Sequence, residues 1–291
     1  PEEYHHLLIR AVFISRYSMA RLAVSSMFFH EYPIADILPL VEGSGSDTLE
    51  FWIETPYFWL RGLPVQDLAT ALGEYPAFGP IALHAPVLDL NPCSINPQVA
   101  DLTLAYVKKT MEIAEKVDAG TVTVHPGKRT AKREPSQYDF QRFELLIDLL
   151  REYARTSRAR ICIENMAPAV NSLLSRPDEV EELLDRESWL WFTLDTAHAL
   201  AGSEQDLERY REVAQDRIAN IHLSGTRDGI LHLPVQDDPV LAQFLSRIAD
   251  DGYDGIVTLE IEDMNLSHPL GMEEKMTFLS HEIDYIRTFL P

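Results

Sequence analysis

The chain has 291 residues, a formal net charge of −21 and two cysteines. The negative charge argues against a nucleic-acid partner, because basic side chains that neutralise phosphates supply most of the affinity of nucleic-acid binders. Two cysteines cannot build a disulfide framework, and no apolar run is long enough to cross a membrane. The apolar residues near the start are interrupted by arginine and no cleavage site follows them, so we expect no signal peptide and a cytoplasmic protein.

Strand-like and helix-like segments alternate eight times along the chain. The strands are predicted at 21–27, 48–54, 80–84, 120–125, 159–164, 189–195, 217–223 and 255–261. The helices are predicted at 34–42, 65–74, 97–118, 136–156, 177–185, 204–215, 239–251 and 272–289, with Ser136, Pro177 and Ser203 as start signals. This order predicts one α/β domain over 21–291, a (β/α)8 barrel of parallel strands, with residues 1–20 as a helical N-terminal extension.

Metal-binding side chains recur at the ends of the predicted strands. Carboxylates and imidazoles are the ligands that hold catalytic zinc or manganese, and the carboxyl ends of barrel strands meet at one mouth. The residues at these ends are His84, His125, Glu164, Asp195, His222 and Glu260, and His198 and His232 follow in adjacent segments. The sequence therefore predicts a metal site at the carboxyl-terminal mouth.

The alternation of side chains along each strand supports this interpretation. If each ligand faces the barrel interior, the residue before it must face outward and be apolar. The preceding residues are Leu83, Val124, Ile163, Leu194, Ile221 and Leu259. Any one histidine could be a hydrogen-bonded core residue, but burying six such groups together without a cation would cost much free energy.

Several short motifs in these segments resemble those of one superfamily. They are HAP at 84–86, HPG at 125–127, IEN at 163–165, LDTAH at 194–198 and IHLSGTRDG at 221–229. Together they resemble the xylose isomerase-like TIM barrels, which include endonuclease IV-type enzymes and isomerases and epimerases of sugars and sugar phosphates. The resemblance covers about residues 21–290 and implies a TIM barrel with a metal site, but it does not single out one reaction.

The endonuclease IV pattern, carried onto this chain, implies three metal ions. The first would be held by His84, His125 and Glu164, and Glu164 would bridge to a second, held also by Asp195, His222 and Glu260. The third would need His198, His232 and an aspartate two residues before His232. That position is Ile230, and Asp228 is out of register by two. We therefore expect the third ion to bind weakly or not at all.

The epimerase pattern implies one divalent ion on Glu164, Asp195, His222 and Glu260. By this resemblance Glu164 and Glu260 are the catalytic pair, one removing a proton from carbon and the other returning it. His198 and Arg227 would contact substrate oxygens. His84 and His125 have no role in the epimerase pattern, and we expect them to flank a second ion. We expect one or two ions, drawn from manganese, zinc, cobalt and magnesium.

Two loops at the mouth are candidate substrate contacts. The segment after the second strand is aromatic, and its rings either pack at the rim of the barrel or stack on a sugar ring. The candidate substrate-binding residues in it are Trp52, Tyr57 and Trp59, together with Glu54. The loop after the fourth strand is basic, and is either a solvated loop or an anion-binding lid that uses Lys128 and Arg129.

The favoured function is a metal-dependent isomerase or epimerase of a sugar or sugar phosphate. The alternative is an endonuclease IV-like phosphodiesterase acting at abasic DNA sites, and a third is another lyase or hydrolase of small molecules. A metal-binding protein without activity is the remaining alternative. The sequence leaves the sugar, the metal and a homo-oligomeric state open, because one barrel hosts many reactions.

Overall fold

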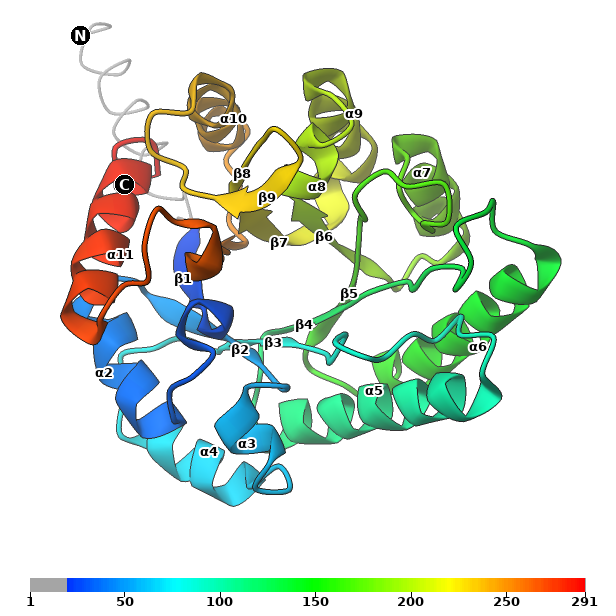
Figure 1. Ribbon diagram of the computed structural model, residues 1–291, viewed down its shortest axis with the longest axis horizontal. Coiled ribbons are helices and arrows are strands. Elements are labelled where there is room, and N and C mark those ends of the chain that lie inside the picture. The colour runs from blue at the N-terminus through cyan, green and yellow to red at the C-terminus, as the bar shows by residue number, and fades with distance from the viewer. Residues whose placement is uncertain (1–19, 291) are drawn as a thin grey trace, which may run out of the picture.

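Eight parallel strands close into a barrel in a computed structural model that describes residues 20–290 (Figure 1). The strand order around the barrel is β1-β10-β7-β6-β5-β4-β3-β2. Their bounds are β1 Arg21–Ser25, β2 Thr48–Trp52, β3 Ala82–His84, β4 Thr121–Val124, β5 Arg160–Glu164, β6 Trp191–Asp195, β7 Ile218–Leu223 and β10 Ile256–Leu259. The predicted (β/α)8 barrel is confirmed. The predicted N-terminal extension lies, except for residue 20, outside the described residues.

A helix follows each strand and covers the outside of the barrel. These helices are α2 Ile34–Gly43, α4 Val65–Gly73, α5 Pro97–Val117, α6 Gln137–Ala154, α7 Pro177–Arg186, α9 Glu204–Ala214, α10 Pro239–Asp250 and α11 Met272–Arg287. The predicted start signals are confirmed: Ser136 forms a capping box with Asp139, Pro177 occupies the first turn of α7, and the Ser203 side chain accepts a hydrogen bond from the Asp206 amide. None of the described helices is both long and apolar enough to span a bilayer.

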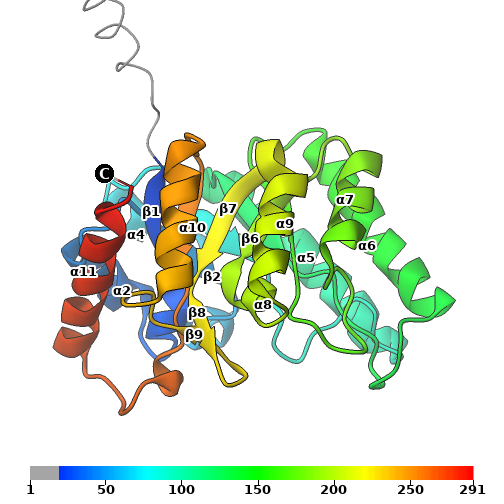
Figure 2. The same ribbon diagram turned by 90° about the horizontal axis from the view of Figure 1, so that it is seen from above.

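Short elements that the sequence did not predict are inserted between strands and helices. They are η1 Ser26–Phe29, α3 Pro56–Trp59, α8 Thr196–Leu200, η2 Gln215–Arg217, η3 Asp263–Asn265 and a hairpin of β8 Gly225–Arg227 and β9 Ile230–Leu233. In the hairpin turn Asp228 and Gly229 have φ of 53° and 78°, the left-handed values that a two-residue turn of type I′ requires. The hairpin and α8 lie at the end to which the β7 arrow points (Figure 2).

Outward-facing strand residues and inward-facing helix residues form the core between the barrel and its helices. Phe192 on β6 stacks on Tyr210 of α9, with ring centroids 6.1 Å apart. Full burial of one large apolar side chain is worth about 1.5–3 kcal/mol, so this layer supplies most of the stability. The interior of the barrel is more polar: Thr123 and Thr193, for example, share a hydrogen bond of 2.9 Å. The barrel interior therefore contains polar side chains that hydrogen-bond to one another.

Candidate metal centre

The predicted ligand residues converge at the carboxyl-terminal mouth of the barrel. His84, Glu164 and Asp195 end their strands, His222 lies within β7, and His125 and Glu260 come directly after β4 and β10. The residues before them, which were expected to face outward, are all at most 1% exposed: Leu83, Val124, Ile163, Leu194, Ile221 and Leu259. All six belong to the main hydrophobic core, as the predicted alternation requires.

Four of these residues form a compact group in which each offers one ligand atom within 4.8 Å of the others: Glu164, Asp195, His222 and Glu260. The Nδ1 atom of His222 lies 3.4 Å from Oε1 of Glu164 and 3.1 Å from Oε2 of Glu260. Three carboxylates and one imidazole are a donor set that suits zinc, manganese or magnesium.

A second group consists of His84, His125 and Glu164. Oε2 of Glu164 lies 3.5 Å from Nε2 of His84 and 2.9 Å from Nε2 of His125. The Nδ1 atom of His84 donates to the carbonyl of Ala85 at 2.8 Å, which leaves the lone pair on Nε2 facing Glu164. Glu164 belongs to both groups, which is the arrangement that the endonuclease IV resemblance implies for a bridging residue.

His198 and His232 form a third group, and Asp195 is the acidic member of it. His198 comes from α8 and has its Nδ1 atom 3.4 Å from Oδ2 of Asp195, while His232 comes from the hairpin strand β9. Ile230 is 47% exposed, so its position in the hairpin supplies no carboxylate. Asp195 on β6 is the carboxylate that lies beside these imidazoles, and the weak or absent binding of a third ion stays a prediction.

Unsatisfied polar atoms test whether these groups suit a cation. A buried polar atom without a hydrogen bond costs about 1–3 kcal/mol, so proteins rarely retain several of them together. Within the described residues, five buried ligand-type atoms at the mouth have no hydrogen-bond partner: His84 Nε2, Glu164 Oε2, Asp195 Oδ2, His222 Nδ1 and Glu260 Oε1. One or two divalent ions bound to these atoms would satisfy them, so the donor set fits the divalent metal that the sequence predicts.

The electrostatics of the cluster also call for positive charge. Burial raises the pKa of Asp195 to about 6 although His198 and His232 lower it, and the carboxylates of Glu164 and Glu260 act in the same direction as burial. Burial also raises the pKa of Glu260, but the adjacent His222 more than offsets this and brings it down to about 2. Burial lowers the pKa of His198, yet Asp195 and Glu164 raise it to about 9. Protonated imidazoles can balance these carboxylates, and a divalent ion would do so while also using the imidazole lone pairs.

The surrounding hydrogen bonds hold the ligand strands in place. Asn165, the last residue of the IEN motif, is fully buried and clamps β6: its side chain accepts from the Asp195 amide at 2.8 Å and donates to the Asp195 carbonyl at 3.0 Å. The Asn165 carbonyl also lies 3.0 Å from Nδ1 of His198.

The sequence reasoning missed Glu50, a fully buried carboxylate on β2 next to His222. The available signal was strand parity, because Thr48, Glu50 and Trp52 alternate with Leu49 and Phe51 along β2.

The aromatic candidates divide between the cluster and the rim. Trp52 is buried and its indole stacks on His84, with centroids 4.1 Å apart and planes 12° apart. Trp59 stacks on Tyr106 of α5 at 4.4 Å, which is rim packing, whereas Tyr57 is 51% exposed.

Three polar candidates are engaged with the protein itself or exposed at its surface. The Glu54 carboxylate accepts hydrogen bonds from the Val87 and Leu88 amides, so it fixes the loop after β3. The Arg129 guanidinium donates to the Glu134 carbonyl and lies 3.9 Å from the Asp139 carboxylate. Arg227 is exposed at the end of β8.

Lys128 is also exposed, and its backbone pairs with that of Ser172 in the loop after β5. The backbone of the basic loop is thus held by the loop after β5. Three of its basic side chains are exposed to solvent: Lys128, Lys132 and Arg133.

Comparison with known proteins identifies the family. Residues 38–282 match the family described as the xylose isomerase-like TIM barrel. The chain is also 30% identical over 275 residues to the uncharacterized protein MJ1188 of Methanocaldococcus jannaschii, a match that covers 94% of this chain and 100% of that protein. The chain therefore belongs to the xylose isomerase-like TIM barrels, and the resemblance inferred from its motifs is confirmed.

Solved structures of two kinds share the fold. A D-tagatose 3-epimerase-like protein is 20% identical, with a TM-score of 0.69 and coverage of 93% of this chain and 100% of its own. Endonuclease IV from Thermus thermophilus is 19% identical, with a TM-score of 0.68, and the match covers 93% of this chain and 98% of that protein. At such low identity these likenesses show the fold alone, and their near-equal scores do not favour either activity.

Proposed function

We propose that the protein is a divalent-metal-dependent isomerase or epimerase of a small sugar or sugar phosphate. The observation that carries this proposal is the position of two carboxylates on either side of one imidazole. Glu164 on β5 and Glu260 after β10 both approach Nδ1 of His222, at 3.4 Å and 3.1 Å, from strands on opposite sides of β7 in the barrel order.

Two carboxylates that reach one small volume from different directions suit proton transfer at a carbon next to a carbonyl. One glutamate removes the proton from the carbon, and the resulting negative charge spreads onto the carbonyl oxygen. The other glutamate returns a proton to the same carbon from the opposite face, which inverts its configuration. A bound divalent ion would polarise the carbonyl and so lower the pKa of the adjacent C–H.

The remaining residues of the site would bind and orient the substrate. His198 lies beside Glu164 and Asp195, where a ring nitrogen can donate to a substrate hydroxyl, and Trp52 has an indole N–H without a partner in the described part of the chain. Tyr57 is the exposed aromatic residue of the loop after β2 and is the candidate to cover a sugar ring. Arg227, Lys128 and Arg129 remain candidates for contacts with a phosphate, although the Arg129 guanidinium must first leave Glu134.

The second candidate is a phosphodiesterase of the endonuclease IV kind. The group of His84, His125 and Glu164, and that of Asp195, His198 and His232, favour it, because several adjacent cations can clamp a phosphate between attacking water and leaving oxygen. The net charge of −21 argues against a duplex DNA substrate, since a strongly acidic surface repels the phosphate backbone.

One parallel assay tests the two candidates. Metal-replete protein is incubated in deuterated water with a panel of ketoses and ketose phosphates, and separately with an abasic-site duplex at low salt. We expect deuterium to enter the carbon next to the carbonyl of at least one sugar, and the Glu164→Gln and Glu260→Gln variants to lose this exchange. Efficient cleavage of the duplex without exchange into any sugar would replace the proposal with the phosphodiesterase.

A further inference from the structure

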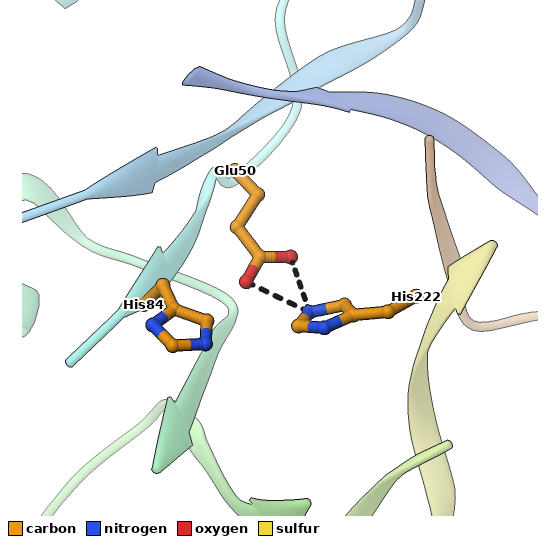
Figure 3. Close-up of side chains that lie close together, drawn as sticks. All are labelled: Glu50, His84 and His222. Atoms are coloured by element: carbon orange, nitrogen blue, oxygen red, sulfur yellow. Dashed lines mark hydrogen bonds and ion pairs between the residues drawn. The ribbon is translucent and has the colours of Figure 1, made fainter. Parts of the chain in front are cut away.

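Glu50 lies inside the barrel on β2, one of the two barrel strands that supply none of the proposed metal ligands. It is the central inward-facing residue of β2 and is 0% exposed (Figure 3). An isolated buried carboxylate is costly, so its retention requires compensating contacts. The position of its partners indicates what it does.

The Glu50 carboxylate is fully engaged by side chains from β7 and β10. Its Oε2 atom accepts from Nδ2 of Asn220 at 2.7 Å and from Oγ1 of Thr258 at 2.8 Å. Nε2 of His222 lies 3.0 Å from Oε1 and 3.1 Å from Oε2 of the same carboxylate, as the dashed lines of Figure 3 mark. Because an ionised carboxylate only accepts hydrogen bonds, Nε2 of His222 must carry the proton.

This hydrogen bond determines which nitrogen of His222 faces the candidate metal group. With the proton on Nε2, the lone pair of Nδ1 points to the space between Glu164 and Glu260. Nδ1 is one of the buried atoms without a hydrogen-bond partner within the described residues. A carboxylate behind a ligating imidazole fixes the ring and its tautomer, and it also strengthens the imidazole as a ligand.

We propose that Glu50 is a positioning residue that holds His222 in the tautomer and orientation needed to bind a divalent ion through Nδ1. This inference rests on the proposed function only in assuming that the group of Glu164, Asp195, His222 and Glu260 binds such an ion. It assigns a role to β2, which contributes none of the residues of that group.

A direct ligand role for Glu50 is the competing explanation. Glu50, His84 and His222 each offer an atom within 4.8 Å of the others and could surround a cation (Figure 3). This arrangement would require His222 to bind ions through both nitrogens, and Oε2 of Glu50 already accepts two hydrogen bonds. The positioning role therefore accounts for more of the observed contacts.

The Glu50→Gln variant tests the proposal with little change in volume. Asn220 Nδ2 requires an acceptor, so the new amide places its carbonyl oxygen at the Oε2 position and its NH2 group at the Oε1 position. That NH2 group then faces the Nε2–H of His222, donor against donor, and the carbonyl oxygen, 3.1 Å from Nε2, already accepts from Asn220 and Thr258. The matched control is Glu282→Gln, because Glu282 on α11 is also a buried glutamate, whose carboxylate accepts from the Val235 and Gln236 amides and which belongs to none of the ligand groups.

Two measurements are made on the full chain: zinc affinity and stoichiometry by competition with a chromophoric chelator, and the 15N and 1H NMR signals of His222 in the zinc-loaded protein. We expect Glu50→Gln to weaken zinc binding about 10- to 100-fold without changing the number of ions, as losses of such outer partners do. The wild type should show a protonated Nε2 with a slowly exchanging proton, and the variant should lose that signal. Glu282→Gln should leave both measurements unchanged.

The other outcomes distinguish the possible errors. Unchanged affinity and an unchanged His222 signal in Glu50→Gln would overturn the positioning role while leaving the metal centre intact. Loss of one whole zinc equivalent would overturn it in favour of a direct ligand. No zinc binding by the wild type would overturn the metal-dependent function together with this inference. If Glu50→Gln fails to fold, Glu50→Asp keeps the charge but withdraws it by one methylene, and we expect it to weaken binding by a smaller factor; unchanged binding in that variant would contradict the proposal.

Discussion

Replacement of Glu164 by glutamine should remove the stabilisation that a divalent ion gives to this protein. Glu164 belongs to two of the ligand groups and lies within 3.5 Å of imidazole nitrogens from both. An ion present at 100 times its dissociation constant stabilises the folded state by about 2.7 kcal/mol. For a domain of this size that corresponds to a rise in melting temperature of about 5–10 °C.

The variant should show almost none of this rise. Loss of an outer partner of a metal ligand already weakens binding about 10- to 100-fold, so loss of the ligand itself should weaken it by at least about 100-fold. The same ion concentration then only equals the dissociation constant, and the stabilisation falls to about 0.4 kcal/mol, or about 1 °C.

The assay is thermal unfolding with and without added metal, after chelator treatment of both proteins. Only the metal-dependent shift is compared, because without metal Glu164 still contacts His125 at 2.9 Å and its removal changes the baseline. Glu282→Gln serves as the control for replacing a buried glutamate. An equal metal-dependent shift in Glu164→Gln and the wild type would refute the assignment of Glu164 as a ligand.

Three further predictions concern separate features. First, Cys93 and Cys162 should resist thiol reagents until the protein unfolds, because burial raises the pKa of each to about 12; rapid labelling of the native protein would contradict this. Second, burial raises the pKa of Glu187, but hydrogen bonds from Arg151 and Trp189 more than offset it and hold the pKa low. The stabilisation that these contacts give the folded protein is therefore present above the unfolded-state pKa of about 4.3 and is lost as the pH falls below it. Glu187→Gln should then lose less of its free energy of unfolding on acidification than the wild type. Equal losses in the two proteins, measured by urea unfolding, would contradict this. Third, Ile230→Asp should add a metal equivalent next to His198 and His232, since it places a carboxylate at the position where the endonuclease IV pattern has an aspartate; an unchanged metal count by mass spectrometry would contradict this.

The barrel and the clustering of the candidate ligands could be predicted because their signals are local and repeated. The helix predicted at 97–118 is observed at Pro97–Val117, and the strand predicted at 159–164 at Arg160–Glu164. Six of the eight barrel strands have an acidic residue or histidine at their end or next to it. The closed fold then brings these ends together without any need to know the side-chain contacts in advance.

The features that the sequence did not reveal depend on distant partners. The contacts of Glu50 with Asn220 and His222 join residues 170 and 172 positions apart, and a single glutamate within an aromatic strand does not indicate them. Glu54 and Arg129 have the residue types expected of substrate contacts, but loops that come close only in the folded chain engage them instead. The one-turn helix α8 has the same origin, because Asp195, whose side chain caps it, has its backbone amide and carbonyl bound by the side chain of Asn165.

We propose that the mouth of the barrel binds a divalent ion on Glu164, Asp195, His222 and Glu260. Anomalous X-ray diffraction from crystals grown with manganese or zinc tests this most directly. We expect a peak within about 2.0–2.3 Å of one atom from each of these four residues, with Nδ1 as the ligand atom of His222. Absence of a peak at the mouth, or a peak coordinated through Nε2 of His222, would contradict it.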